Sequence, residues 1–287
     1  MPESPRRPAH NSALIDLLLI AALVVYAVSA ILFFWTRPYL LALLLLPAPL
    51  ALAMRLGPAG PSIAAAGALI GPATEMACVA GGLWSYSQTG GLPLIPPWLF
   101  VIWGCFPTAL WLIVKSLLGE PAVEIPASKR FTLPLCLVGI GLQIALFVAL
   151  SHSLLLIIAS ALIFSGAILY LLPGAERKTG LVLLAAGAVL GPACEALPVS
   201  VGAWSYARPD LFGLPLWLPL AYALFAVLVA FAARAAQEAF ACTDRRIPAI
   251  SLIFVSVSLS LCGLVSKLLK IKPTDAEQNH RDTEAQR

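Results

Sequence analysis

Charged residues are scarce in this chain. Asp, Glu, Lys and Arg make up 11% of its 287 residues, against about a quarter in an ordinary soluble domain. Hydrophobic residues make up 60%, and the mean hydropathy is +0.93. This composition excludes a soluble globular protein and predicts an integral membrane protein with many spans. The net charge of +4 does not indicate nucleic-acid binding, because the basic residues lie between apolar segments, where they anchor loops.

The sequence also lacks the signatures of several chemistries. Its six cysteines form no C-x-x-C pair, which argues against a metal site and against a disulfide framework. A glycine-rich phosphate loop, a His-Glu-x-x-His helix and a nucleophile elbow are all missing. We therefore expect no metal and no cofactor. Because the chain has no soluble segment large enough to bind a nucleotide, ATP-driven transport by this chain alone is excluded.

Apolar segments of about 20 residues, the length of a helix that crosses a bilayer, follow one another along the chain. They predict an all-α, polytopic bundle of about nine spans, with two tandem four-helix repeats in parallel orientation and one C-terminal segment. The expected spans are 13–35, 38–56, 62–83, 96–118, 131–150, 153–173, 179–202, 216–238 and 248–266. The corresponding units are an N-tail (1–12), a first repeat (13–118), a cytoplasmic linker (119–130), a second repeat (131–238), a loop with an extra span (239–266) and a disordered tail (267–287).

A short sequence motif occurs twice. Gly71–Glu75 reads Gly-Pro-Ala-Thr-Glu, and Gly191–Glu195 reads Gly-Pro-Ala-Cys-Glu, 120 residues later. A Trp-Ser-Tyr triplet follows each Glu, at Trp84–Tyr86 and Trp204–Tyr206, and a Gly-Leu-Pro turn follows each triplet. Since four spans precede the middle of the chain and four follow it, we expect the copies to be related by an axis along the membrane normal.

Each copy places one carboxylate, Glu75 or Glu195, inside an apolar span. A carboxylate there is costly and is a functional-site hypothesis by default. Nine residues of helix cover about 13 Å, so we expect each triplet at the outer end of its helix and both carboxylates near the middle of the bilayer. Two close carboxyls cannot both ionise easily. One could protonate an alkene while the other stabilises a carbocation or activates water. Alternatively, each Glu is a neutral hydrogen-bonding strut between helices.

Four aromatic residues are candidate substrate-binding residues. Trp84, Tyr86, Trp204 and Tyr206 have the same spacing from the Glu in both copies, which favours a pocket mouth that holds a polyene or a ring. The alternative is an ordinary aromatic belt at the membrane interface.

Three further residues of the motif are candidates for the binding site. Thr74 could supply a hydrogen bond inside the bundle. Pro72 and Pro192 precede each Glu by three residues, where proline frees a backbone carbonyl and could shape a pocket. The alternative for both prolines is a packing kink.

Lys and Arg predict the orientation. With a cytoplasmic N-terminus, eleven of them fall in the N-tail and the inside loops, and only Arg37 and Arg208 fall in the outside loops. We therefore expect a multi-pass protein of a bacterial-type inner membrane. The basic C-terminal tail disagrees with nine spans, and its side is left open.

The order of Glu, aromatic-x-Tyr, Gly-x-Pro and a Trp-bearing apolar helix resembles the membrane family that hydrates carotenoid ends, the bisanhydrobacterioruberin hydratases. The matching residues are Glu75, Trp84, Tyr86, Gly91, Pro93 and Trp98, with Glu195, Trp204, Tyr206, Gly213 and Pro215 in the second copy. Membrane lycopene cyclases and the sterol-responsive Insig proteins are looser comparisons. The resemblance implies a hydratase-type enzyme that protonates a double bond of a long isoprenoid.

Three functions stay open from the sequence. The first is that enzyme, with Glu75 or Glu195 as the acid and the other as its carboxylate partner. The second is a proton-coupled transporter of a hydrophobic cargo, since two repeats around a protonatable site also describe a carrier. The third is a non-catalytic lipid-sensing or assembly protein. In each case the expected partners are a membrane lipid or isoprenoid and the bilayer, and not nucleic acid.

Overall fold

The computed structural model of the chain describes residues 10–119 and 131–243. These residues form long helices and two three-residue strands. The helices are α1 (His10–Phe34), α2 (Pro38–Leu45), α3 (Pro47–Leu56), α4 (Gly60–Ala80), α5 (Trp98–Leu118), α7 (Leu133–Ala149), α8 (Leu154–Leu171), α9 (Gly174–Ser200) and α10 (Leu218–Thr243). The strands are β1 (Trp84–Tyr86) and β2 (Trp204–Tyr206).

The expectation of an all-α, polytopic membrane protein is confirmed. Seven segments of the described chain are long and apolar enough to cross a membrane, and α7 is a shorter apolar helix. Each of the first eight expected spans, up to 216–238, is helical, and the second consists of two helices. The ninth, at 248–266, lies outside the described residues, as do the linker residues 120–130 and the tail from 267. The proposed unit boundaries stay a prediction.

The second span differs from the expected continuous helix, because it breaks at Pro47 into α2 and α3. Proline has no backbone N–H and so cannot continue the hydrogen-bond ladder of the preceding turn. Just before Pro47, the N–H of Leu46 donates to the carbonyl of Leu43 at 3.3 Å. Donor and acceptor are three residues apart, as in a 3₁₀-helix, whereas an α-helix has four.

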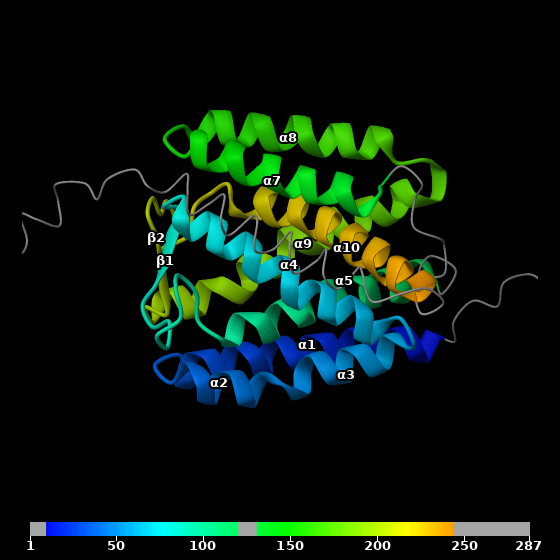
Figure 1. Ribbon diagram of the computed structural model, residues 1–287, viewed down its shortest axis with the longest axis horizontal. Helices are drawn as coiled ribbons and strands as arrows, with labels where there is room; N and C mark the ends of the chain where they lie inside the picture. Colours follow the sequence, from blue (N-terminus) through cyan, green and yellow to red (C-terminus); the bar gives the residue numbers. More distant parts are fainter. Residues whose placement is uncertain (1–9, 120–130, 244–287) are drawn as a thin grey trace, which may run out of the picture. The chain divides into compact units, whose positions relative to one another are not determined.

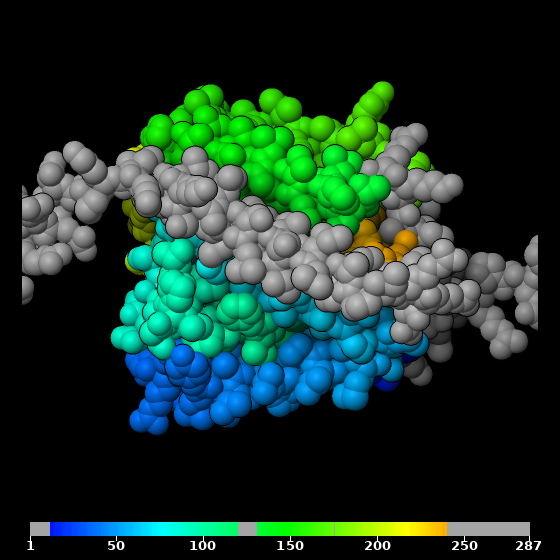
Figure 2. Space-filling view, in the orientation of Figure 1, coloured from blue at the N-terminus to red at the C-terminus, as the bar shows by residue number. Residues whose placement is uncertain are grey.

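Helices α4, α5, α9 and α10 form the centre of the bundle. Helix α4 packs on α5 and α10, and α10 packs on α9. Figure 1 shows α1, α2 and α3 on one side of these four and α7 and α8 on the other. In the space-filling view of Figure 2, the same two groups of helices form opposite edges of one face.

Burial separates the central helices from the outer ones. In α10, 72% of the membrane-spanning window is buried, against 17% in α1 and in α8. Apolar side chains on the outer helices are exposed, for example Phe33 at 78% and Ile163 at 74%. Such surfaces suit contact with lipid tails, so the bundle interior around α4, α9 and α10 is the place to look for a site.

Helices α4 and α9 each end in a turn that sends the chain back toward the bundle. Gly82 has φ +74° and Gly202 has φ +79°, a left-handed conformation that glycine adopts without steric cost. The following strands β1 and β2 then pair antiparallel, with Ser85 opposite Ser205 (Figure 1). The sequence predicts helix as far as residues 83 and 202 and no strands, so both helices end earlier than expected.

Candidate functional site

The first carboxylate lies beneath strand β1. Glu75 in α4 is buried. The indole Nε1 of Trp84 donates to Glu75 Oε2 at 2.9 Å, and the hydroxyl of Tyr86 donates to the same oxygen at 2.8 Å. The expectation of an unbroken helix from Glu75 to Trp84 is therefore wrong, because α4 ends at Ala80 and β1 begins at Trp84. A turn at Gly81 and Gly82 follows α4 and brings the side chains of the triplet to the carboxylate.

The second carboxylate has a similar setting with one more donor. Glu195 in α9 is buried. Trp204 Nε1 donates to Oε2 at 3.4 Å, and the Tyr206 hydroxyl also donates to Oε2. The hydroxyl of Tyr222 in α10 donates to Oε1. Sequence reasoning missed Tyr222, because it lies outside the repeated motif. Its one signal is that it is the single tyrosine within α10.

The two carboxylates are thus held unlike each other. Both bonds to Glu75 reach one oxygen, Oε2, whereas both oxygens of Glu195 accept bonds. The difference comes from the opposing helix, which offers a tyrosine hydroxyl only to Glu195.

The two strands place four aromatic rings on one face, since alternate residues of a strand point the same way. The ring of Trp84 lies 5.6 Å from that of Tyr206, and the ring of Tyr86 lies 5.8 Å from that of Trp204, between centroids. Trp98, at the start of α5, packs on Trp204 at 6.1 Å. The aromatic rings therefore form one layer beside the carboxylates. Their role in binding a substrate stays a prediction.

The glycine of each Gly-Pro-Ala segment makes room for an aromatic ring. A Cβ on Gly71 would lie 2.1 Å from Cγ of Trp103 in α5, and one on Gly191 would lie 2.0 Å from Cγ of Tyr222. Both rings therefore rest directly on the helix that carries the Glu, one turn before the carboxylate. This close approach explains why both copies have glycine at this position.

Two cavities meet at the carboxylate pair. The first encloses about 540 Å³, counted out to its mouth, between α4, α7 and α10. The second encloses about 430 Å³ between α1, α5 and the strands. Glu75, Glu195, Trp103 and Tyr222 line both cavities. Both carboxylates therefore line both cavities.

The remaining predicted binding residues divide by position. Trp84, Tyr206 and Thr74 line the first cavity, and Tyr86 and Trp204 line the second. The Thr74 hydroxyl donates to the backbone carbonyl one turn earlier in α4.

Neither predicted proline lines either of these two cavities. Pro72 lies inside α4 and Pro192 inside α9, and the lining of both cavities is made by other residues. Their position suits the packing-kink alternative.

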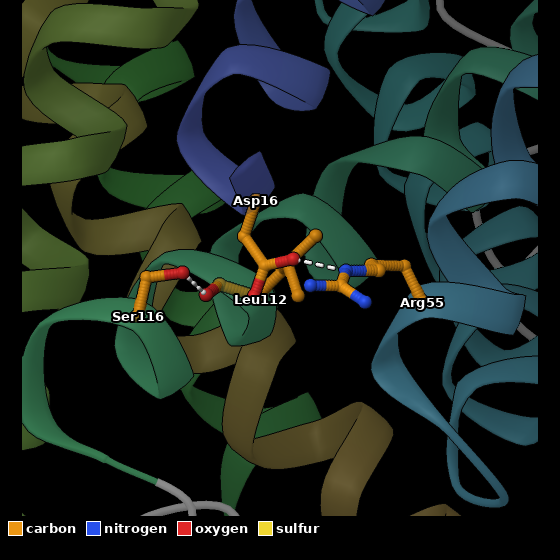
Figure 3. A network of polar contacts seen from close by, with 4 residues as sticks. All are labelled: Asp16, Arg55, Leu112 and Ser116. Carbon is orange, nitrogen blue, oxygen red and sulfur yellow. Dashed lines mark hydrogen bonds and ion pairs between the residues drawn. The ribbon is translucent and has the colours of Figure 1, made fainter. Parts of the chain in front are cut away.

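A second polar contact lies at the far end of the bundle. Arg55 of α3 donates to Asp16 of α1, whose side chain is 4% exposed. Figure 3 shows this pair beside Ser116, which donates to the carbonyl of Leu112 in α5 at 2.8 Å. Ser116 is 18 residues beyond Trp98 along α5, or about 27 Å of helix. This ion pair joins α1 to α3 and is separate from the carboxylate site.

Comparisons with known proteins give a limited likeness. No family model matches the chain, and no curated protein matches it. Two solved structures of MvINS, a mycobacterial Insig homolog from Mycobacterium vanbaalenii, are similar. One has a TM-score of 0.46 at 22% identity and covers 61% of this chain and 94% of that chain. The other, a cross-linked trimer, has a TM-score of 0.45 at 21% identity and covers 61% and 91%. The resemblance to carotenoid hydratases stays a prediction.

The phenols beside the carboxylates predict loss of stability in alkali. Burial raises the pKa of Tyr86 well above the usual 10.0, and the carboxyl of Glu75 raises it further. Burial and Glu195 do the same to the pKa of Tyr206. The unfolded chain releases these protons near pH 10 and the folded chain does not. Stability should therefore hold below about pH 10 and fall above it, by up to about 1.4 kcal/mol per pH unit for each phenol.

The measurement for this prediction is the thermal midpoint in nanodiscs from about pH 8 to 12. Tyr206→Phe should make the alkaline slope shallower. Tyr170→Phe, at a phenol that is 82% exposed, is the matched control and should leave it unchanged. An equal slope in all three proteins would contradict the prediction.

Proposed function

We propose that the protein binds a long, hydrophobic, isoprenoid- or carotenoid-like lipid inside the membrane and acts as a non-catalytic lipid-sensing or assembly protein. The observation that carries this proposal is the first cavity, whose lining is mostly apolar and includes the Glu75–Glu195 pair. Both oxygens of Glu195 already accept hydrogen bonds within the chain. Glu195 is therefore better suited to be a fixed polar group in the cavity wall than to take part in a reaction.

The proposal also covers the membrane and the orientation of the chain in it. The chain is an integral, multi-pass membrane protein, and we place it in a bacterial-type inner membrane with its N-terminus in the cytoplasm. The bias of Lys and Arg toward the expected inside loops supports this orientation. We also propose that its two halves are tandem repeats in parallel orientation. The antiparallel pairing of the two Trp-Ser-Tyr triplets supports this arrangement, since such a pair has local two-fold symmetry.

Mass spectrometry of lipids that co-purify in native-membrane nanodiscs tests the binding function. Ala221→Trp fills the first cavity, because Ala221 lines it. Val138→Trp adds the same ring to an exposed position of α7 and is the control. The wild type and the control should retain a polyene or isoprenoid, and the cavity-filled variant should retain at most a tenth as much. Equal retention in all three would show that the lipid lies elsewhere.

One observation favours hydratase-type catalysis as a second candidate. Because Trp84 and Tyr86 both donate to Oε2 of Glu75, Oε1 is left for a substrate. A protonated Glu75 would give its proton to one alkene carbon, and water would add its oxygen to the other. The second water proton would then return to the carboxylate. The product would be the substrate plus one water.

The same nanodiscs distinguish these functions. An acyclic polyene that is added and recovered unchanged supports binding alone. A product heavier by one water supports the hydratase. Flux of the lipid that requires a pH gradient across vesicles would instead indicate the transporter.

A further inference from the structure

We propose that the polar end of the bound lipid is a hydroxyl group, and that it docks on the Glu75 side of the carboxylate pair, where Gln143 and Trp103 offer it a hydrogen-bond acceptor and a donor. This inference rests on the proposed lipid-binding function and names the chemistry of its ligand.

Gln143 supplies the acceptor. It lies in α7, is 6% exposed and lines the first cavity together with both carboxylates. Its Nε2 donates to the backbone carbonyl of Ala221 at 2.9 Å. Because a carbonyl can only accept, this bond fixes which end of the amide is nitrogen. The other end, Oε1, is buried and has no hydrogen-bond partner within the described residues.

Trp103 supplies the donor. It lies in α5, is 6% exposed, and lines both cavities. Its ring rests on Gly71 as the Tyr222 ring rests on Gly191. The Tyr222 hydroxyl is satisfied by Glu195. The Trp103 Nε1 is buried and interacts with the Glu75 carboxyl, but this contact lacks the geometry of a hydrogen bond, and Nε1 has no other hydrogen-bond partner within the described residues. The Glu195 side is thus closed by the protein itself, and the Glu75 side is left open.

The two unpartnered groups together select the ligand. A buried polar atom without a partner is costly, so a bound molecule that satisfies it gains affinity. A hydroxyl both donates and accepts, and it can serve Gln143 Oε1 and Trp103 Nε1. An ammonium group only donates, an ether oxygen only accepts, and a hydrocarbon end does neither. The carboxylates alone would favour an ammonium group, so the two neighbours decide against it.

The test compares three probes of equal length on wild-type protein in nanodiscs: geranylgeraniol, its methyl ether and geranylgeranylamine. The alcohol should bind about tenfold more tightly than the ether, which cannot donate to Gln143. The alcohol should also bind more tightly than the amine. Equal affinity for alcohol and ether, or tighter binding of the amine, would overturn the assignment while leaving lipid binding intact. If none of the probes binds, the proposed function itself fails.

Two variants test whether Gln143 and Trp103 cause the tighter binding of the alcohol. Gln143→Leu should bind alcohol and ether equally, and retention of the full preference would overturn the role of Gln143. Trp103→Phe keeps a ring above Gly71 and removes only the N–H, so it should weaken alcohol and ether by a similar factor. Thr108→Val is the control, because Thr108 is buried in α5 and bonds only to the carbonyl of Gly104 there. If Gln143→Leu does not fold, the wild-type comparison and Trp103→Phe still decide the matter.

Discussion

Glu195→Gln is expected to destabilise the protein by about 1–3 kcal/mol, whereas Glu75→Gln should cost well under 1 kcal/mol. A glutamine side chain offers one acceptor oxygen and one donor NH2 group. At position 75 the oxygen can take both bonds, because Trp84 and Tyr86 already share Oε2. At position 195 both oxygens are acceptors, so an NH2 group in place of either oxygen leaves a present donor without its acceptor. The Tyr222 hydroxyl can accept a bond from that NH2 group, but its own proton then loses Glu195.

The thermal midpoint of each variant in nanodiscs measures this difference. Tyr222→Phe provides an internal check through a double-mutant cycle. In the wild-type background it removes a bond to Glu195 Oε1 and should lower stability. In the Glu195→Gln background it removes a mismatched donor and should cost little. Equal losses for Glu75→Gln and Glu195→Gln, with purely additive effects of Tyr222→Phe, would contradict the unlike ligation of the two carboxylates.

Gly191→Ala is expected to destabilise the protein by about 1–3 kcal/mol, the usual cost of an extra methyl group in a packed interior. The new Cβ would fall 2.0 Å from the ring of Tyr222, so the ring must move away from α9 and its hydroxyl from Glu195. Gly71→Ala should behave in the same way toward Trp103, whose ring atoms lie as close as 2.1 Å to the added Cβ.

The same substitution at a position with free space is expected to increase stability instead. Gly141 in α7 has no atom within 4 Å of an added Cβ. Gly141→Ala should therefore gain up to about 1 kcal/mol from the lower backbone entropy of alanine in a helix. Thermal midpoints of the three variants compare these effects directly. A loss of stability at Gly141 similar to that at Gly191 would mean that the cost is general to the helices and not due to the aromatic rings.

The sequence was sufficient for the helices and for the paired acids. Long apolar segments indicate spans because of the thickness of the bilayer, and Glu75 and Glu195 stand out because a carboxylate is rare there. The strands could not be predicted, since three residues carry no periodicity. The nine residues from Glu75 to Trp84 were therefore interpreted as helix. The deciding signal is Gly81-Gly82, a pair that favours a turn, although the expected span 62–83 runs through it.

The other residues around the two acids were harder to find. Tyr222, Trp103 and Gln143 lie in three different spans and belong to no repeated motif. Gly71 and Gly191 indicate that something packs closely on their helices, but a glycine does not specify which ring fills the space. Only the packing of α5 on α4 and of α10 on α9 identifies Trp103 and Tyr222.

The pairing of β1 with β2 has a consequence for folding during synthesis at the ribosome. Ser85 and Ser205 are 120 residues apart, and the ribbon is flanked by further backbone bonds, from Ser87 to Ala203 and from Ala207 to Leu83. Until the second triplet has been synthesised, β1 has no strand to pair with. The aromatic layer beside Glu75 then lacks the rings of Trp204 and Tyr206. Early insertion of the first spans therefore cannot complete the lipid site. It closes late, when the two halves of the chain meet in the membrane.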